Sequence, residues 1–214
     1  MSSYSSCLDQ VSFDDGYIPT FFDVGCNINP IPTQCGVLED FTDLFLSKYP
    51  NAKGYAVDPM YWQSYEKKWG DRITLIKKAL SDTIGTATLY TPGIEDEFKS
   101  HAISSLHNRD CFSHGIAEDE VECTTIDTLF TQYKLKNIDY LKIDTEGAEL
   151  MILRGSEQAL TERKIECIQL EYGATYTDGG FGIEDVIEYL ARFEYQEFFR
   201  TNEELLFAHK DDIP

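Results

Sequence analysis

The alternation of short strands with helices constrains the fold of this chain more than any other feature of its sequence. Runs rich in β-branched and aromatic residues predict strands at 20–24, 53–57, 73–79, 86–91, 121–124, 138–143, 165–170, 195–200 and 204–210. Helices are predicted at 37–48, 61–69, 126–133, 147–160 and 183–190. Such alternation is typical of an α/β domain with a parallel, doubly wound sheet. The last two predicted strands flank a turn at 201–203, so the final strand is expected to be antiparallel.

The length of 214 residues fits a single domain, residues 1–214. Within it we distinguish an N-terminal extension at 1–19 and a long, partly irregular insertion at 92–120. We expect this insertion near the substrate cleft, because long loops in compact domains are often functional. No apolar run approaches the roughly 18 residues that a membrane helix needs, and the polar N-terminus lacks a secretory signal pattern. We therefore predict a cytoplasmic protein without membrane insertion.

The charge and the cysteines exclude some classes of partner. The chain has 38 acidic and 18 basic residues and a net charge of -20. Nucleic-acid binding depends on lysine and arginine side chains that neutralise phosphates, so no nucleic-acid partner is expected. The six cysteines include no CxxC pair, which argues against a zinc site of that pattern, and we expect reduced, mostly buried thiols. Neutral or cationic small molecules and glycans remain as candidate substrates.

Ligands of doubly wound sheets bind outside the carboxyl ends of the strands, so the residues there are the first candidates for a site. The first predicted strand ends at Gly25, where a glycine permits positive φ and a close approach to a ligand. The dinucleotide fingerprint GxGxxG would need two further glycines, and Asn27 and Pro30 stand in their places. A nicotinamide cofactor is therefore disfavoured, although an ordinary turn between strand and helix explains Gly25 equally well.

Acidic residues follow two other predicted strands. Asp58 ends the second strand, where a carboxylate can accept hydrogen bonds from both hydroxyls of a ribose. The alternative is that Asp58 only begins a turn with Pro59. Asp144 ends the strand at 138–143, and Glu146 and Glu149 follow it closely. Capping of the next helix explains one or two of these acids, and we expect Asp144 to face the ligand cleft.

These segments, taken together, resemble the FkbM-like family of methyltransferases. The resemblance runs through FDVGCNI at 22–28, YAVDP at 55–59, KALSDTIG at 78–85 and TIDTL at 125–129. Its most specific part is IDYLKIDTEGAE at 138–149, continued by LRG at 153–155. The order and spacing of the segments hold from about residue 21 to residue 171.

The resemblance implies a Rossmann-like class I methyltransferase fold, with seven strands, an antiparallel last strand and helices on both faces of the sheet. It also implies S-adenosylmethionine as cofactor and O-methylation, commonly of a hydroxyl of a sugar or natural product. The implied cofactor contacts are Gly25 and Asn27 lining the methionine end, Asp23 holding that end, Asp58 at the ribose, Ala79 and Leu80 beside the adenine, and Asp144 near the methyl group.

The sequence departs from the family pattern just after the segment at 22–28 and within the segment at 55–59. Asn29 stands where the family usually has a glycine, and residues 30–36 lengthen the loop before the next helix. The ribose acid is Asp58, where glutamate is common in the family. The cradle for the amino-acid end of the cofactor is therefore expected to be rebuilt by this loop.

A neutral sugar hydroxyl is a poor nucleophile, so we expect a general base, which contributes on the order of 10²–10⁴-fold. The candidates are Asp144, placed first by its location, then Glu146, Glu171 and His107. His107 lies within the insertion, and a lone loop histidine is more often without a catalytic role. Asp144 and Glu171 are alternatively suited to hold Mg²⁺, which prefers oxygen ligands, although no metal is assigned.

Three other functions stay open from the sequence. One is a catalytically inactive binding module that keeps the cofactor fold, and another is a nicotinamide-dependent oxidoreductase. The third is a part or relative of a larger glycan-building enzyme. The acids Asp23, Asp58 and Asp144 are all present, which favours an active enzyme. The expected partner is thus a small-molecule or glycan acceptor.

Overall fold

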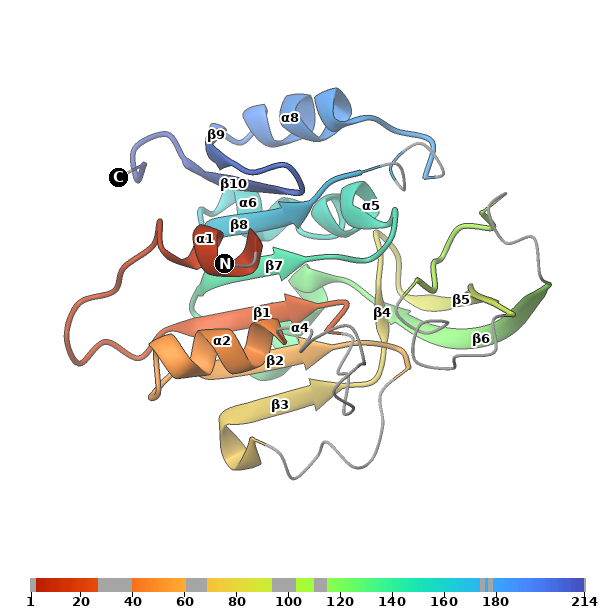
Figure 1. Ribbon diagram of the computed structural model, residues 1–214, viewed down its shortest axis with the longest axis horizontal. Helices are drawn as coiled ribbons and strands as arrows, with labels where there is room; N and C mark the ends of the chain where they lie inside the picture. The colour runs from red at the N-terminus through yellow and green to blue at the C-terminus, as the bar shows by residue number, and fades with distance from the viewer. Residues whose placement is uncertain are drawn as a thin grey trace.

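A seven-stranded sheet forms the centre of the molecule (Figure 1). The computed structural model describes residues 3–26, 40–60, 69–93, 103–109, 115–173, 176 and 179–213. The strand order is β3-β2-β1-β7-β8-β10-β9. The strands are β1 Thr20–Val24, β2 Lys53–Val57, β3 Ile73–Ile76, β7 Ile138–Ile143, β8 Ile165–Glu171, β9 Tyr195–Arg200 and β10 Glu204–His209.

The pairing of the strands confirms the predicted fold class. The pairs β3-β2, β2-β1, β1-β7 and β7-β8 are parallel. The last strand, β10, is antiparallel to both of its neighbours and lies between β8 and β9. All six residues of β7 are buried, because a strand at the centre of a parallel sheet is covered on both faces. The carboxyl ends of β1, β2 and β7 therefore meet at one edge of the sheet.

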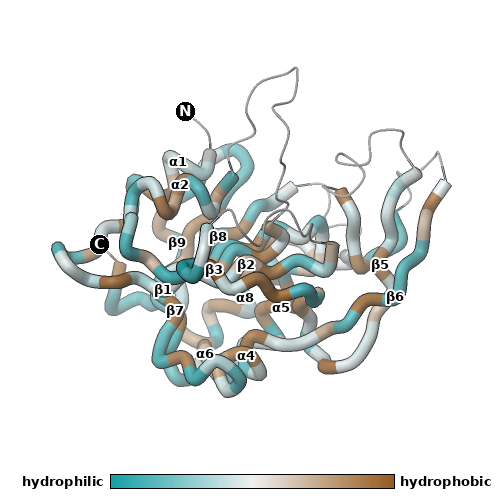
Figure 2. The backbone as a smooth tube through the Cα atoms, turned by 90° about the horizontal axis from the view of Figure 1, so that it is seen from below, coloured by the Kyte–Doolittle hydropathy of each residue, from teal (hydrophilic) through white to brown (hydrophobic). Residues whose placement is uncertain are grey.

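Helices cover both faces of this sheet, as Figure 2 shows from a perpendicular direction. On one face, α1 (Ser3–Leu8) and α2 (Phe41–Lys48) bury an aromatic cluster that includes Phe21, Phe45 and Tyr140. On the other face the larger core cluster contains residues of four helices. These are α4 (Ile126–Tyr133), α5 (Glu149–Arg154), α6 (Glu157–Thr161) and α8 (Ile183–Ala191).

A second sheet of three strands projects from one side of the first (Figure 1). It has the order β4-β6-β5, with β4 Ala79–Leu80, β5 Gly85–Pro92 and β6 Ile116–Thr124. The single strand expected at 73–79 is wrong, since β3 ends at Ile76 and β4 pairs with β6 instead. The strand expected at 121–124 begins earlier, at Ile116, so the end of the predicted insertion is regular structure.

The single helix expected at 147–160 is also wrong, because α5 ends at Arg154 and α6 begins at Glu157. Gly155 separates them, and a Cβ on Gly155 would lie 2.1 Å from the carbonyl oxygen of Ser81. The chain between the helices thus packs directly against the backbone that follows β4. This contact between distant segments ends α5, and no local pattern announces it.

The N-terminal extension contains α1, a helix that the sequence analysis did not predict. Cys7 and Leu8 of this helix are buried. Most of the helix expected at 61–69, and the first part of the one expected at 37–48, lie outside the described residues. Within the described part of the chain, no helix has the length and apolar character needed to span a bilayer.

Candidate functional site

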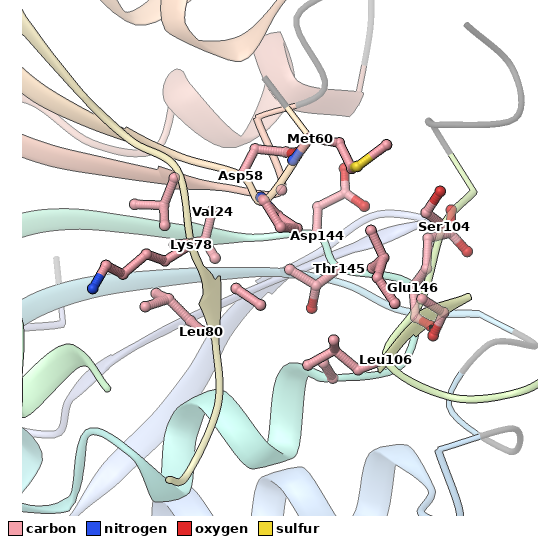
Figure 3. Close-up of a pocket in the computed structure, with 17 residues that line it drawn as sticks. Val24, Asp58, Met60, Lys78, Leu80, Ser104, Leu106, Asp144, Thr145 and Glu146 are labelled. Carbon is pink, nitrogen blue, oxygen red and sulfur yellow. Dashed lines mark hydrogen bonds between the residues drawn. The ribbon is translucent and has the colours of Figure 1, made fainter. Parts of the chain in front are cut away.

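A hollow opens at the carboxyl edge of the central sheet, between the two sheets (Figure 3). It encloses about 570 Å³ of empty space, part of which is open to solvent. Residues from the ends of β1, β2, β4 and β7 and from the segment 103–109 line it. They include Gly25, Asp58, Ala79, Leu80, Ser105, Leu106, Asp144 and Glu146.

The floor of the hollow is backbone that approaches closely at Gly25. This residue has φ +72°, and a Cβ there would lie 1.8 Å from the carbonyl oxygen of Asp144. Only glycine accepts both the conformation and the contact. Asp144 N in turn donates to the carbonyl of Val24 at 3.1 Å. The ends of β1 and β7 are therefore held together, which leaves room for a ligand above them.

Asp58 and several apolar side chains form one side of the hollow. The Asp58 Oδ1 accepts a 2.7 Å hydrogen bond from Met60 N, the contact expected of a residue that begins a turn. Asp58 also lines the hollow, so beginning the turn and contacting a ligand are compatible roles for it. Apolar side chains nearby offer a surface on which a flat ring can pack: Leu80, Leu89, Leu106 and Ala148.

A buried lysine links two of the predicted acids. Lys142 is the fifth residue of β7, and its side chain is 4% exposed. Its Nζ lies 3.3 Å from Asp23 Oδ1 and 3.1 Å from Asp144 Oδ2. It also donates to the carbonyl of Gly25 at 3.4 Å. Burial alone would lower the pKa of Lys142, but the carboxylates of Asp144 and Asp23 raise it well above its ordinary value, so the lysine stays charged.

Asp144 and Glu171 have opposite protonation preferences. Burial would raise the pKa of Asp144, but Lys142 and hydrogen bonds from Glu171 and Tyr4 hold it below its usual range. Burial and the neighbouring charge of Asp144 raise the pKa of Glu171 to about 10. At neutral pH Asp144 is therefore a carboxylate, and Glu171 carries the proton of the hydrogen bond between them.

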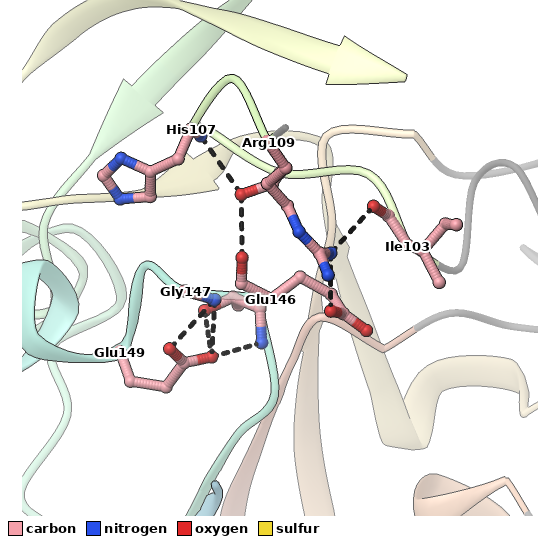
Figure 4. A network of polar contacts seen from close by, with 8 residues as sticks. Ile103, His107, Arg109, Glu146, Gly147 and Glu149 are labelled. Carbon is pink, nitrogen blue, oxygen red and sulfur yellow. Dashed lines mark hydrogen bonds and ion pairs between the residues drawn. The ribbon is translucent and has the colours of Figure 1, made fainter. Parts of the chain in front are cut away.

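The segment 103–109 is fastened over the hollow by Glu146 (Figure 4). Ser105 Oγ donates to the carbonyl of Glu146 at 2.7 Å, and Arg109 forms a 2.8 Å ion pair with the Glu146 carboxylate. Ser105 also bridges to Tyr90 of β5. Glu146 has φ +58°, a conformation that costs on the order of 1–3 kcal/mol and persists where its surroundings enforce it. The contacts with Ser105 and Arg109 hold Glu146 in that conformation.

Glu149 has a local structural role in the described residues. Its carboxylate accepts hydrogen bonds from Thr145 N at 2.8 Å and from Gly147 N at 3.0 Å. It thereby fixes the turn between β7 and α5. The helix begins at Glu149, so Glu146 precedes the first turn of the helix, and the capping explanation does not apply to it.

The predicted site residues fall into four groups. Gly25, Asp58, Ala79, Leu80, Asp144 and Glu146 share the hollow. Asp23, which is 1% exposed, lies behind it and accepts a 2.8 Å hydrogen bond from Thr42, while Glu171 contacts Asp144. The ring of His107 is turned away from Glu146 (Figure 4). Asn27 lies outside the described residues.

The sequence analysis did not identify three polar side chains that shape this site. Tyr4 of α1 donates to Asp144 Oδ2 at 2.8 Å, Arg109 pairs with Glu146, and Lys142 joins Asp23 to Asp144. Lys142 had a readable signal, since a lysine in an otherwise apolar central strand needs a buried counter-charge. Tyr4 and Arg109 act across long sequence separations and carried no local signal.

Two kinds of group could occupy this site, a divalent cation and S-adenosylmethionine. Side-chain oxygens of Asp144, Glu146 and Glu171 lie within 4.8 Å of one another. Lys142 and Arg109 already neutralise two of these carboxylates, so a divalent cation would have to displace them. S-adenosylmethionine suits the hollow better, because a close backbone approach, a strand-end carboxylate and an apolar slot occur together at Gly25, Asp58 and Leu80.

Comparisons with known proteins agree with this geometry. A family model described as the methyltransferase FkbM domain matches residues 23–197. A solved structure, methyltransferase FkbM from Methylobacillus flagellatus KT, has a similar fold, with a TM-score of 0.59 and 15% sequence identity. The match covers 96% of this chain and 47% of that one, so this chain spans about half its length. A comparison with curated proteins found no match. On the extent of the family match, the chain belongs to the FkbM family of methyltransferases.

Proposed function

We propose that this chain is an S-adenosylmethionine-dependent O-methyltransferase that acts on a hydroxyl of a sugar, a glycan or a small natural product. The observation that carries the proposal is that Asp58 and Asp144, which follow β2 and β7 on either side of β1, line one hollow. One of these acids suits a ribose and the other a reacting hydroxyl. Membership of the FkbM family supports methyl transfer as the reaction.

The binding of the cofactor is assigned to residues of the sheet edge. Asp58 accepts hydrogen bonds from the ribose hydroxyls, which are charge-assisted and worth roughly 1.5–3 kcal/mol each. Ala79 and Leu80 lie against the adenine, and Gly25 lets the backbone approach the methionine end. Asp23 has a buried Oδ1 without a hydrogen bond, 3.3 Å from Lys142. Asp23 is buried behind the hollow, so its proposed hold on the methionine end of the cofactor would be indirect.

The bound cofactor supplies a methyl group on a positively charged sulfur. Asp144, which would lie near this methyl group, would accept a hydrogen bond from the acceptor hydroxyl and take up its proton, while the methyl carbon would leave the cofactor's sulfur, which becomes a neutral thioether, for the hydroxyl oxygen. The low pKa of Asp144, which Lys142 maintains against burial, makes the carboxylate available over a wide pH range. Glu171, already protonated, orients Asp144 by donating to it. Glu146 holds the segment 103–109 in place and is not assigned the proton transfer.

Charge around Asp144 favours an uncharged acceptor. The described cations beside the site are engaged: Lys142 by Asp23 and Asp144, Arg109 by Glu146, and Lys78, which lines the hollow, by Glu122. An anionic acceptor would meet these carboxylates without a matching cation in the described part of the site. The net charge of -20 adds to that repulsion and disfavours a nucleic acid. A neutral polyol, such as a sugar, meets no such penalty.

The proposal is tested by methyl transfer to a panel of mono- and oligosaccharides and phenolic natural products. S-adenosylhomocysteine formation and methylated products would be measured by mass spectrometry, with and without Mg²⁺. We expect transfer without added metal, and a loss of about 10²-fold or more in Asp144→Asn. Asp15→Asn is the matched control, because Asp15 is exposed and precedes β1 at the opposite edge of the sheet.

Three outcomes would contradict the proposal. If Asp144→Asn retained the wild-type rate, the proton would be taken up elsewhere, and Glu171 or His107 would be examined next. If S-adenosylmethionine bound but no acceptor in the panel were methylated, the alternative of an inactive binding module would replace the enzyme. An absolute requirement for Mg²⁺ would mean that a cation displaces Lys142 or Arg109 from the carboxylates.

A further inference from the structure

The N-terminal helix brings a phenol to the carboxylate at the centre of the site. Tyr4 in α1 donates a 2.8 Å hydrogen bond to Asp144 Oδ2, and Lys142 Nζ lies 3.1 Å from the same oxygen. The Lys142 Nζ is also 5.4 Å from the centre of the Tyr4 ring. Two donors thus hold Oδ2 of Asp144, in addition to the hydrogen bond that this carboxylate receives from Glu171.

The position of Tyr4 is fixed by the packing of α1. Cys7 and Leu8 are 0% and 3% exposed. The side chains of Lys48 and Tyr49, at the end of α2, donate hydrogen bonds to the carbonyl of Val11, at 3.2 and 2.7 Å. Lys48 also donates to the carbonyl of Leu8. The segment after α1 is therefore tied to α2, which leaves the Tyr4 hydroxyl little freedom to leave Asp144.

We propose that Tyr4 is a positioning residue for methyl transfer: with Lys142 it holds Asp144 Oδ2 and so turns Oδ1 toward the acceptor. This role rests on the proposed function and adds a residue from outside the segment that matches the family model, which begins at residue 23. A carboxylate that rotated freely would present its oxygens in several directions. Fixing one oxygen with two donors restricts the other to one direction, as positioning for transfer requires.

The alternative is that Tyr4 only packs α1 against the sheet, and its ring does contact Phe41 with centroids 6.1 Å apart. The two roles differ in what happens to Asp144 when the hydroxyl is removed. Removing the Tyr4 hydroxyl leaves the other titratable or charged groups around Asp144 in place. These groups are Asp23 of β1, Lys142 of β7, Glu146 and Glu149 after β7, Glu171 of β8 and Glu204 of β10.

The test compares Tyr4→Phe with a matched control, Tyr17→Phe. The first variant keeps the ring contacts with Phe41 and Lys142 and removes only the hydroxyl. The second removes a hydroxyl that donates an equally long bond, 2.8 Å, to Asp139 near the other end of β7. Asp144 in protein labelled with ¹³C at the aspartate carboxyls would be followed by NMR during an acid titration, its signal identified by its loss in Asp144→Asn.

Tyr4→Phe is expected to raise the titration midpoint of Asp144 by about one pH unit, a tenfold change in proton affinity, because the carboxylate loses a donor. Tyr17→Phe should leave the midpoint unchanged. An unchanged midpoint in Tyr4→Phe, or an equal rise in both variants, would overturn the proposed role of Tyr4.

Calorimetric titration of S-adenosylmethionine against pH gives a second readout. In Tyr4→Phe the acid loss of affinity is expected to begin about one pH unit higher, while the affinity at pH 8 stays within about twofold of wild type. A loss of affinity that is equal at every pH would indicate that Tyr4 only packs α1 against the sheet. That result would overturn the positioning role of Tyr4 but not the proposed function. Failure of the wild type to bind would overturn the proposed function, and this role with it.

Discussion

Replacing Lys142 with methionine tests the charge arrangement beneath the hollow. Methionine fills a similar volume but removes the cation that pairs with Asp23 at 3.3 Å and with Asp144 at 3.1 Å. Asp23 is 1% exposed, so its carboxylate would be left buried beside another without a counter-charge. Breaking a buried pair in this way typically costs about 3–5 kcal/mol.

For a chain of this length each kcal/mol lowers the melting temperature by about 2–4 °C, so a fall of about 6–20 °C is expected for Lys142→Met. The free energy of unfolding would be measured by urea titration at several pH values. Without Lys142 the pKa of Asp144 rises in the folded state, so the stability of the variant is lost as pH rises above the ordinary carboxyl range. The deficit should therefore shrink toward about pH 4.

Lys164→Met is the matched control, because the Lys164 side chain is 38% exposed and its ion pair with Glu162 lies at the surface. Exposed pairs contribute about 0–1 kcal/mol. If Lys142→Met cost no more than Lys164→Met, or if its deficit were the same at pH 4 and pH 8, the charge arrangement described here would be refuted.

Two further predictions concern the floor and the rear of the site. Gly25→Ala is expected to abolish S-adenosylmethionine binding in calorimetry and to destabilise the fold, because its Cβ would lie 1.8 Å from a backbone oxygen. Gly173→Ala is the control and should do neither, because a Cβ there would meet nothing within 4 Å. If Gly25→Ala bound S-adenosylmethionine as tightly as the wild type does, the described contact would be contradicted. Glu171→Gln removes a carboxyl whose pKa is raised to about 10, so the wild type loses stability relative to the variant as pH rises from about 5 to 9. Parallel stability–pH curves in urea titrations would contradict that raised pKa.

The central strands were predicted with correct bounds, and the reason is physical. Strands β1, β2 and β7 are parallel strands rich in apolar and β-favouring residues, and each is followed at once by glycine or aspartate. The break between α5 and α6 was not predictable, because it depends on the contact of Gly155 with Ser81. Helix α1 was missed because it is short and rich in serine, although Tyr4, Cys7 and Leu8 do have helical spacing.

The site residues that the sequence predicted are those that directly follow a strand. Gly25, Asp58 and Asp144 each follow a strand, and parallel strands bring such residues to one edge. The partners that set their charges come from elsewhere: Tyr4 from the N-terminal helix and Arg109 from the insertion. Such contacts depend on the packing of distant segments, so no local pattern could have indicated them.

The most direct test of the account is a calorimetric titration of S-adenosylmethionine and S-adenosylhomocysteine into the wild type, Asp58→Ala and the exposed-site control Asp15→Ala. We predict micromolar binding by the wild type and the control, weakened about tenfold or more in Asp58→Ala, as expected from the loss of a charged hydrogen bond. Absence of binding by the wild type, with and without Mg²⁺, would contradict the account and leave a binding module of another kind as its replacement.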